Sequence, residues 1–150
     1  MSRQRKKTGI TDAIEKLYTG KAGEHLVMAH LLRRGYVAMS ATVDTDVDVI
    51  AHAHDDTDRV VQFQVKTTTI ADIRLRFENS KLDEFWTSGI NLCVVFWQKA
   101  EPTPVVFPTR LIHMMTTGGF DDSRAPIHRG RKYTSFRVRM LEDGTVYVRI

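Results

Sequence analysis

Two neighbouring stretches decide the fold: VDTDVDVIAHA at residues 43–53 and RVVQFQVKTT at residues 59–68. In both, apolar and polar residues alternate. Side chains of a β-strand point to opposite faces in turn, so each stretch predicts a strand with one apolar and one polar face. The segment between them, residues 54–58, is rich in turn-forming residues. The pattern therefore predicts an antiparallel β-hairpin.

The polar side chains of this hairpin are expected on one face. If the turn centres near Asp56, residues whose numbers sum to 112 lie opposite each other. Asp48 then faces Gln64, and Asp46 faces Lys66. A shift of the turn by one or two residues would change this register. The hairpin is thus expected to gather acid, amide and amine groups in one place.

A helix is predicted over residues 20–34, ending at Gly35, a favourable C-cap. Glu24 lies in the middle of its apolar arc, which comprises Val27, Met28, Leu31 and Leu32. A carboxylate that points at the core needs a partner, because burying a lone charge is costly. The partner is a lysine or arginine, a metal ion or a proton; otherwise the carboxylate lies at the open end of the helix.

Packing this helix against the polar face of the hairpin would bring Glu24 towards Asp48 and Gln64. Three oxygen ligands beside the ammonium group of Lys66 suit Mg²⁺, which prefers oxygen ligands. Such an ion stabilises developing charge on a scissile phosphate and lowers the pKa of a bound water. Lys66 would orient or deprotonate that water, or steady the phosphate in the transition state.

These residues resemble the PD-(D/E)xK nuclease superfamily. The resemblance covers about residues 20–68: Gly23-Glu24 in the helix, then Asp48-Val49-Ile50-Ala51, then Gln64-Val65-Lys66. It implies an α/β (α+β) restriction-endonuclease-like core, with a central mixed β-sheet flanked by helices. By the same resemblance, Lys66 is catalytic, and the ligands of Mg²⁺ (or Mn²⁺) are Glu24, Asp48, Gln64 and the main-chain carbonyl of Val65.

Gln64 departs from the family pattern, which usually has an acid there. A neutral amide removes one negative charge, so metal affinity should fall. The Gln-x-Lys variant is similar to that of an intron-encoded homing endonuclease, and the layout is similar to that of Holliday-junction resolvases. Asp46 is a candidate for supplying the missing charge, and Gln62 is a second auxiliary candidate.

The basic residues gather at the two ends of the chain. Residues 1–7 carry a charge of +4, residues 123–150 carry +5, and residues 8–122 carry −5. Lysine and arginine displace counterions from phosphates, so such ends suit a polyanion. We therefore expect DNA contacts from two groups, Arg129, Arg131 and Lys132 near the C-terminus and Arg3, Arg5, Lys6 and Lys7 near the N-terminus.

The remaining pattern predicts a basic tail over residues 1–10 and a single domain over 11–150 with one central sheet. Thr11 is the expected N-cap of a short helix over residues 12–18. Further helices are expected from Ser80 to Trp86 and from Pro108 to about residue 117, before a loop at 120–132. Further strands are expected at 36–41, 73–78, 91–97, 103–107, 133–141 and 145–150.

Cys93, the only cysteine, lies in an apolar run and predicts a buried, reduced thiol in a cytoplasmic protein. No apolar run approaches the roughly 18 residues of a membrane helix, and no secretory signal follows the basic N-terminus.

The expected activity is metal-dependent hydrolysis of phosphodiester bonds in duplex or branched DNA, as in homing, restriction or junction-resolving endonucleases. Cutting two strands needs two sites, so a homodimer or higher homo-oligomer is expected. The alternative is a DNA-binding module of the same fold with weak or no catalysis, which the neutral Gln64 motivates.

Overall fold

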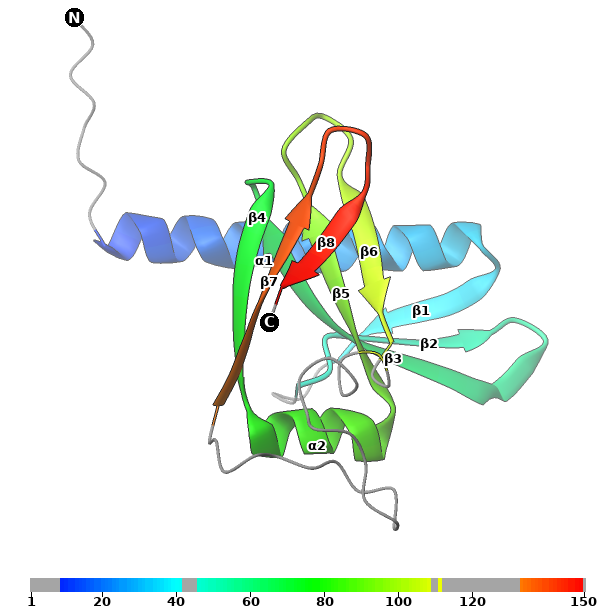
Figure 1. Ribbon diagram of the computed structural model, residues 1–150. Helices are drawn as coiled ribbons and strands as arrows, with labels where there is room; N and C mark the ends of the chain where they lie inside the picture. Colours follow the sequence, from blue (N-terminus) through cyan, green and yellow to red (C-terminus); the bar gives the residue numbers. More distant parts are fainter. Residues whose placement is uncertain (1–8, 42–45, 109–110, 112–132, 150) are drawn as a thin grey trace, which may run out of the picture.

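The structure is a computed structural model that describes residues 9–41, 46–108, 111 and 133–149, with side chains from residue 12 onward. Apart from the helical residue 111, these ranges contain two helices and eight strands (Figure 1). In chain order they are α1 (Gly9–Arg33), β1 (Tyr36–Ser40), β2 (Val49–Ala53), β3 (Asp56–Thr68), β4 (Asp72–Glu78), α2 (Asn79–Ser88), β5 (Ile90–Phe96), β6 (Thr103–Phe107), β7 (Tyr133–Met140) and β8 (Val146–Arg149).

The strands form two sheets. The larger has the order β1-β2-β3-β5-β6, and it is mixed because β3 and β5 run parallel while its other neighbours are antiparallel. This confirms the expected α+β fold with a central mixed sheet flanked by helices. The expectation of one sheet was wrong, because β4, β7 and β8 form a separate antiparallel sheet.

The larger sheet is the middle layer of the molecule (Figure 1). On one face α1 packs through Val27 against a cluster that includes Val49, Phe63, Val65 and Val95. On the other face, α2 and the smaller sheet enclose a second cluster that includes Leu82, Phe85, Leu92, Val94, Phe136 and Val138. The smaller sheet forms because the alternating apolar residues of β4 and β7 need a surface to bury them, which this face of the larger sheet supplies.

The hairpin register is as expected, although its turn is not. Pairing runs from Val49 opposite Phe63 to His52 opposite Val60, so the paired numbers sum to 112. The turn, however, lies at residues 54–55, since Ala53 pairs with Asp56. The register shifts at a bulge between His52 and Ala53. Residues 57–59 of β3 are the extra residues of this bulge, and beyond it His52 pairs with Val60. β2 is also shorter than expected and begins at Val49.

The two helices expected at residues 12–18 and 20–34 are one continuous helix, α1. Gly20 lowers helix propensity by about 1 kcal/mol relative to alanine, which the packing of the long helix outweighs. The helix begins at Gly9 rather than after the expected cap at Thr11. At its other end it stops before Gly35, whose φ of 86° fits the expected terminator.

α1 packs on the apolar face of the hairpin, not on the polar face as expected. Its Val27 contacts the cluster that contains Phe63 and Val65, because an apolar arc is best buried against apolar side chains. At the closest approach, a Cβ on Gly23 would lie 1.8 Å from Oγ1 of Thr67. Leu32, assigned to the buried arc, is 56% exposed.

The other boundaries fall close to those expected. α2 begins after Glu78 rather than at Ser80 and ends at Gly89, whose φ of 66° is left-handed. The expected helix over residues 108–117 and the loop at 120–132 lie largely outside the described residues. None of the helices in the described part of the chain combines the length and apolarity that a membrane crossing requires.

Candidate active site

Asp48 binds the backbone on both sides of Gln64. Its N–H donates to the carbonyl of Phe63 at 2.9 Å, and its Oδ2 accepts from the N–H of Val65 at 2.7 Å. Because β2 begins only at Val49, no further residue of that strand extends the ladder beside Val65. The Asp48 carboxylate therefore takes the place of a backbone acceptor for the N–H of Val65, just before β2 begins.

Gln64 has a buried amide oxygen without a partner. Among the described residues, its Oε1 and Oγ1 of Thr67 are the buried side-chain oxygens that no hydrogen bond satisfies. An unpaired buried polar atom costs about 1–3 kcal/mol, so such an atom calls for an explanation. The hydrogen bonds of Asp48 to Phe63 and Val65, the two chain neighbours of Gln64, place the backbone of Gln64 beside Asp48.

Glu24 is paired with a lysine of its own helix. Nζ of Lys21 lies 3.0 Å from Oε2 of Glu24, and the Glu24 side chain is only 13% exposed. The carboxylate therefore turns away from bulk solvent, as its place in the apolar arc predicts. Lys21 was not among the predicted site residues, although the i, i+3 spacing of an opposite charge was a signal that could have found it.

Four charged groups act on one another around Asp48. Burial raises the pKa of Asp48 above its ordinary value of 3.8, and the charge of Glu24 raises it further. The N–H of Val65 and the ammonium groups of Lys66 and Lys21 oppose that rise. The hydrogen bond and charge of Glu24 in turn raise the pKa of Lys21. Thus α1 and β3 both contribute charges to the surroundings of the Asp48 carboxyl.

Lys66 also borders a cleft of about 750 Å³ between the first half of α1 and the end of β3. The strand side contributes Val65 to Ile70, and the helix side contributes Asp12, Glu15, Lys16, Thr19 and Gly20. A concave space thus lies directly beside Lys66, where a ligand could approach its side chain.

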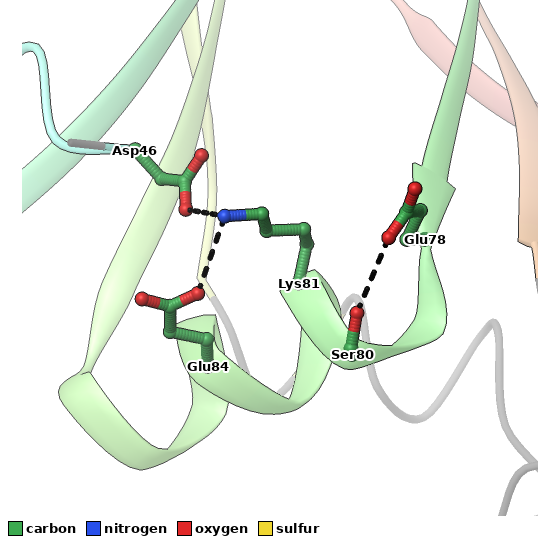
Figure 2. Close-up of polar contacts among 5 residues, drawn as sticks. All are labelled: Asp46, Glu78, Ser80, Lys81 and Glu84. Atoms are coloured by element: carbon green, nitrogen blue, oxygen red, sulfur yellow. Dashed lines mark hydrogen bonds and ion pairs between the residues drawn. The ribbon is translucent and has the colours of Figure 1, made fainter. Parts of the chain in front are cut away.

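Asp46 lies outside the strand ladder and contacts α2 instead of facing Lys66. Figure 2 shows its carboxylate turned towards Lys81, whose Nζ lies 2.7 Å from Oδ2 of Asp46 and 3.6 Å from Glu84. The expected pairing of Asp46 with Lys66 was therefore wrong. The short strand β2 explains it, because the alternation of a strand does not extend to Asp46.

Gln62, the other auxiliary candidate, also contacts the end of α2. Its Nε2 donates to the carbonyl of Ser88 at 3.3 Å. This bond indicates that the polar face of β3 looks towards α2, on the side opposite α1. Gln64, two residues further along the same strand, shares this face, whereas Glu24 belongs to α1 on the other face of the sheet.

The donor set fits a hard divalent cation. It offers the carboxylates of Glu24 and Asp48 and the unpaired amide oxygen of Gln64, and such cations prefer oxygen ligands. Within the described ranges, no three His, Cys, Asp or Glu side chains form a group able to hold a metal ion. A site here would therefore depend on the amide and on backbone or water oxygens as well.

The basic residues expected to contact DNA form two groups in the sequence. Both groups, at residues 3–7 and 129–132, lie outside the described residues.

Cys93 is fully buried, and burial raises the pKa of its thiol to about 12. The thiol is thus protonated at physiological pH and takes no part in this site.

No protein-family model matches the sequence, and no curated protein matches it. Among solved structures, the fold is similar to that of Hjc, a Holliday junction resolvase from Archaeoglobus fulgidus, an archaeal hyperthermophile. The TM-score is 0.50 with 15% sequence identity, and the match covers 77% of this chain and 81% of the resolvase. At this identity the similarity concerns the fold alone.

Proposed function

We propose that the protein is a metal-dependent endonuclease that hydrolyses phosphodiester bonds in DNA. The carrying observation is the buried, unpaired Oε1 of Gln64, a residue whose two chain neighbours, Phe63 and Val65, are both hydrogen-bonded to Asp48. The fold similarity to a Holliday junction resolvase supports the same conclusion, and so does the PD-(D/E)xK-like order of Glu24, Asp48, Gln64 and Lys66.

The ligands proposed for Mg²⁺ or Mn²⁺ are Glu24, Asp48, Gln64 and the carbonyl of Val65. A divalent ion supplies positive charge for the scissile phosphate and acidifies water at neutral pH. The hydrogen bond from Val65 to Oδ2 fixes the orientation of the Asp48 carboxylate, so that its other oxygen is held in place. This pre-orientation reduces the ordering required when a ligand binds.

Lys66 is the residue proposed to act on the attacking water or on the phosphate. Its charge is felt at Asp48, and it borders the cleft beside that group. An ammonium group placed there stabilises charge that develops on a phosphate oxygen. Lys21 supplies the positive charge that balances Glu24 before a metal binds.

The proposed substrate is duplex or branched DNA, and the proposed assembly is a homodimer, because cleavage of two strands needs two such sites. The roles of Asp46 and Gln62 as auxiliary ligands stay predictions. Both side chains have partners in α2, so neither is included in the proposed ligand set.

A second candidate function is DNA binding without catalysis on the same fold. The observation that favours it is the ion pair between Lys21 and Glu24, together with the neutral Gln64. Two carboxylates and two lysines balance each other's charge at the site, so it does not require a metal ion for charge neutrality.

The test is cleavage of plasmid and four-way junction DNA with Mn²⁺, comparing the wild type with Asp48→Asn and Lys66→Ala. Asp48→Asn keeps an oxygen acceptor for the N–H of Val65, so the fold should survive. We expect both variants to lose activity, by at least about a hundredfold for Lys66→Ala, as is typical when a group that assists proton transfer is removed.

Matched controls are Asp58→Asn and Lys99→Ala, which make the same changes at exposed positions away from the site. Both should cleave like the wild type. If the wild type binds DNA but does not cleave it with any divalent metal, the DNA-binding module is correct and the nuclease is wrong. If cleavage persists in both site variants, the proposed residues do not carry it.

A further inference from the structure

The outer face of the smaller sheet is rich in arginine. Along β4, β7 and β8 the apolar residues alternate with exposed ones, and the apolar set packs against the larger sheet. The exposed set therefore lies on the opposite face, which is turned to solvent. It includes five arginines, which we call the arginine face: Arg74, Arg76, Arg137, Arg139 and Arg149.

Three of these arginines form a row across the sheet. Arg74 is paired directly with Arg137, and Arg137 is paired directly with Arg149. Directly opposed side chains lie about 4.5–5.5 Å apart at Cβ, and like charges in that position destabilise a sheet. A row of three cations therefore costs stability in the free protein and indicates an anionic ligand.

The row also encloses a pocket. A hollow of about 230 Å³ is lined by Arg74, Arg137, Arg149, Ser135 and Phe136. Three arginines and one serine thus line a space large enough for a phosphate group. Guanidinium forks match phosphate oxygens with two parallel hydrogen bonds, which a lysine cannot reproduce.

Neighbouring contacts hold parts of this face in place. Nε of Arg137 lies 3.1 Å from Oδ1 of Asp72, and the guanidinium of Arg76 stacks 4.1 Å from the ring centre of Tyr133. Arg74, Arg139 and Arg149 form no ion pair with any other described residue. Their guanidinium groups therefore keep their donors for a ligand.

We propose that the arginine face binds the phosphate backbone of DNA, with one phosphate in the pocket between Arg74, Arg137 and Arg149. Five arginines against Asp72 and Glu78 leave an excess of positive charge on the face. Tyr133 and Tyr147, exposed on the same face, add hydroxyl donors of a kind that commonly contact phosphate oxygens.

A nucleic acid fits this face better than an anionic membrane does. The aromatic residues of the face, Tyr133 and Tyr147, stand among arginines, and the described residues of the face offer no apolar patch to enter a lipid layer. The surface is the outer face of the smaller sheet, whereas the candidate active site is built on α1 and on β3 of the larger sheet. The arginine face would therefore hold a DNA segment other than the one at the candidate active site. This binding does not depend on cleavage.

The test measures binding of a short DNA duplex by fluorescence anisotropy, at salt concentrations between about 50 and 200 mM. The buffer contains a chelator, so that neither cleavage nor metal binding contributes. The double variant Arg74→Gln and Arg149→Gln should bind more weakly and reduce the salt slope by about 2, roughly 0.9 for each phosphate that is no longer neutralised. Its thermal stability should be unchanged or higher, since the repulsion in the row is relieved.

The matched control is Arg33→Gln with Arg34→Gln, which removes the same charge from exposed positions at the end of α1. Its salt slope should stay like that of the wild type. An equal loss in both double variants, or no loss in the arginine-face variant, would overturn the proposal. So would loss of binding to phosphatidylserine vesicles with DNA affinity retained. The double variant Arg74→Lys and Arg149→Lys should keep the salt slope but bind less tightly.

Discussion

Gln64 is the residue on which the chemistry of the candidate site depends most. As a neutral amide it adds no further negative charge to the strand segment that binds Asp48, a residue whose pKa is already raised by burial and by Glu24. The amide oxygen nevertheless stays unpaired in the described structure. Gln64 thus combines a low electrostatic cost in the metal-free protein with an oxygen that suits a cation.

Replacing Gln64 with glutamate should separate these two effects. We expect Gln64→Glu to destabilise the metal-free protein by about 1–3 kcal/mol, because a buried carboxylate without a partner is costly. Mn²⁺ should then raise its melting temperature more than that of the wild type, since a ligand that binds only the folded state stabilises it. Thermal unfolding with a chelator and with Mn²⁺ measures both effects.

The control for this substitution is Gln62→Glu, at a side chain that binds the carbonyl of Ser88 at the end of α2. It introduces the same charge on the same strand but outside the proposed ligand set. Its response to Mn²⁺ should match that of the wild type. Equal responses of the two variants would contradict a metal site at Gln64.

At the scale of elements, the contact between α1 and β3 positions the site. Gly23 lets the helix approach the strand at Thr67, directly beside Glu24, because any larger residue would collide with that side chain. The helix carboxylate reaches the neighbourhood of Asp48 through this close crossing. The position of Glu24 is therefore tied to a glycine that carries no functional group.

Gly23→Ala should destabilise the protein by about 1–3 kcal/mol, as is usual for overpacked cores. The added Cβ would lie 1.8 Å from Oγ1 of Thr67. Adding Thr67→Ala should recover only part of the loss, because Cβ of Thr67 lies 3.0 Å from the same point. The free energy of unfolding from urea titration measures these effects.

Gly20→Ala is the matched control in the same helix. Nothing lies within 4 Å of its added Cβ, so the substitution should stabilise the protein by up to about 1 kcal/mol through better helix propensity. A destabilisation of equal size at Gly20 and Gly23 would mean that the close crossing is not the cause.

Across the whole molecule, positive charge is concentrated in separate regions. The arginine face lies on the smaller sheet, and four further basic residues occupy positions 3–7, outside the described residues. The acidic excess falls in residues 8–122, which include the candidate active site. A polyanion is therefore expected to be held by regions other than the site that acts on it.

Replacing Arg3, Arg5, Lys6 and Lys7 with glutamine tests the part played by the N-terminal charges. We expect weaker binding to duplex DNA and a salt slope reduced by up to about 4, roughly 0.9 for each neutralised phosphate. The measurement is the same anisotropy titration with a chelator present. A variant with Arg33, Arg34, Arg59 and Lys99 changed to glutamine is the control, and an equal slope change there would refute a specific role for the tail.

Local patterns in the sequence determined the hairpin, its register, and the ranges of most strands. Alternation is a property of residues close in the chain, so the register that pairs Val49 with Phe63 followed from the two stretches alone. The burial of Glu24 followed in the same way from its place on a helix face. That Glu24 and Asp48 carry acids and Gln64 an amide was also given by the sequence.

Only the tertiary structure decided which surfaces meet. It placed α1 on the apolar face of the hairpin, turned Asp46 towards Lys81, and set Arg74, Arg137 and Arg149 in one row. Each of these results depends on contacts between segments far apart in the chain, such as β4 with β7. Periodicity states which face of a strand is apolar, but the partner of that face is chosen by the competition of all such faces for burial.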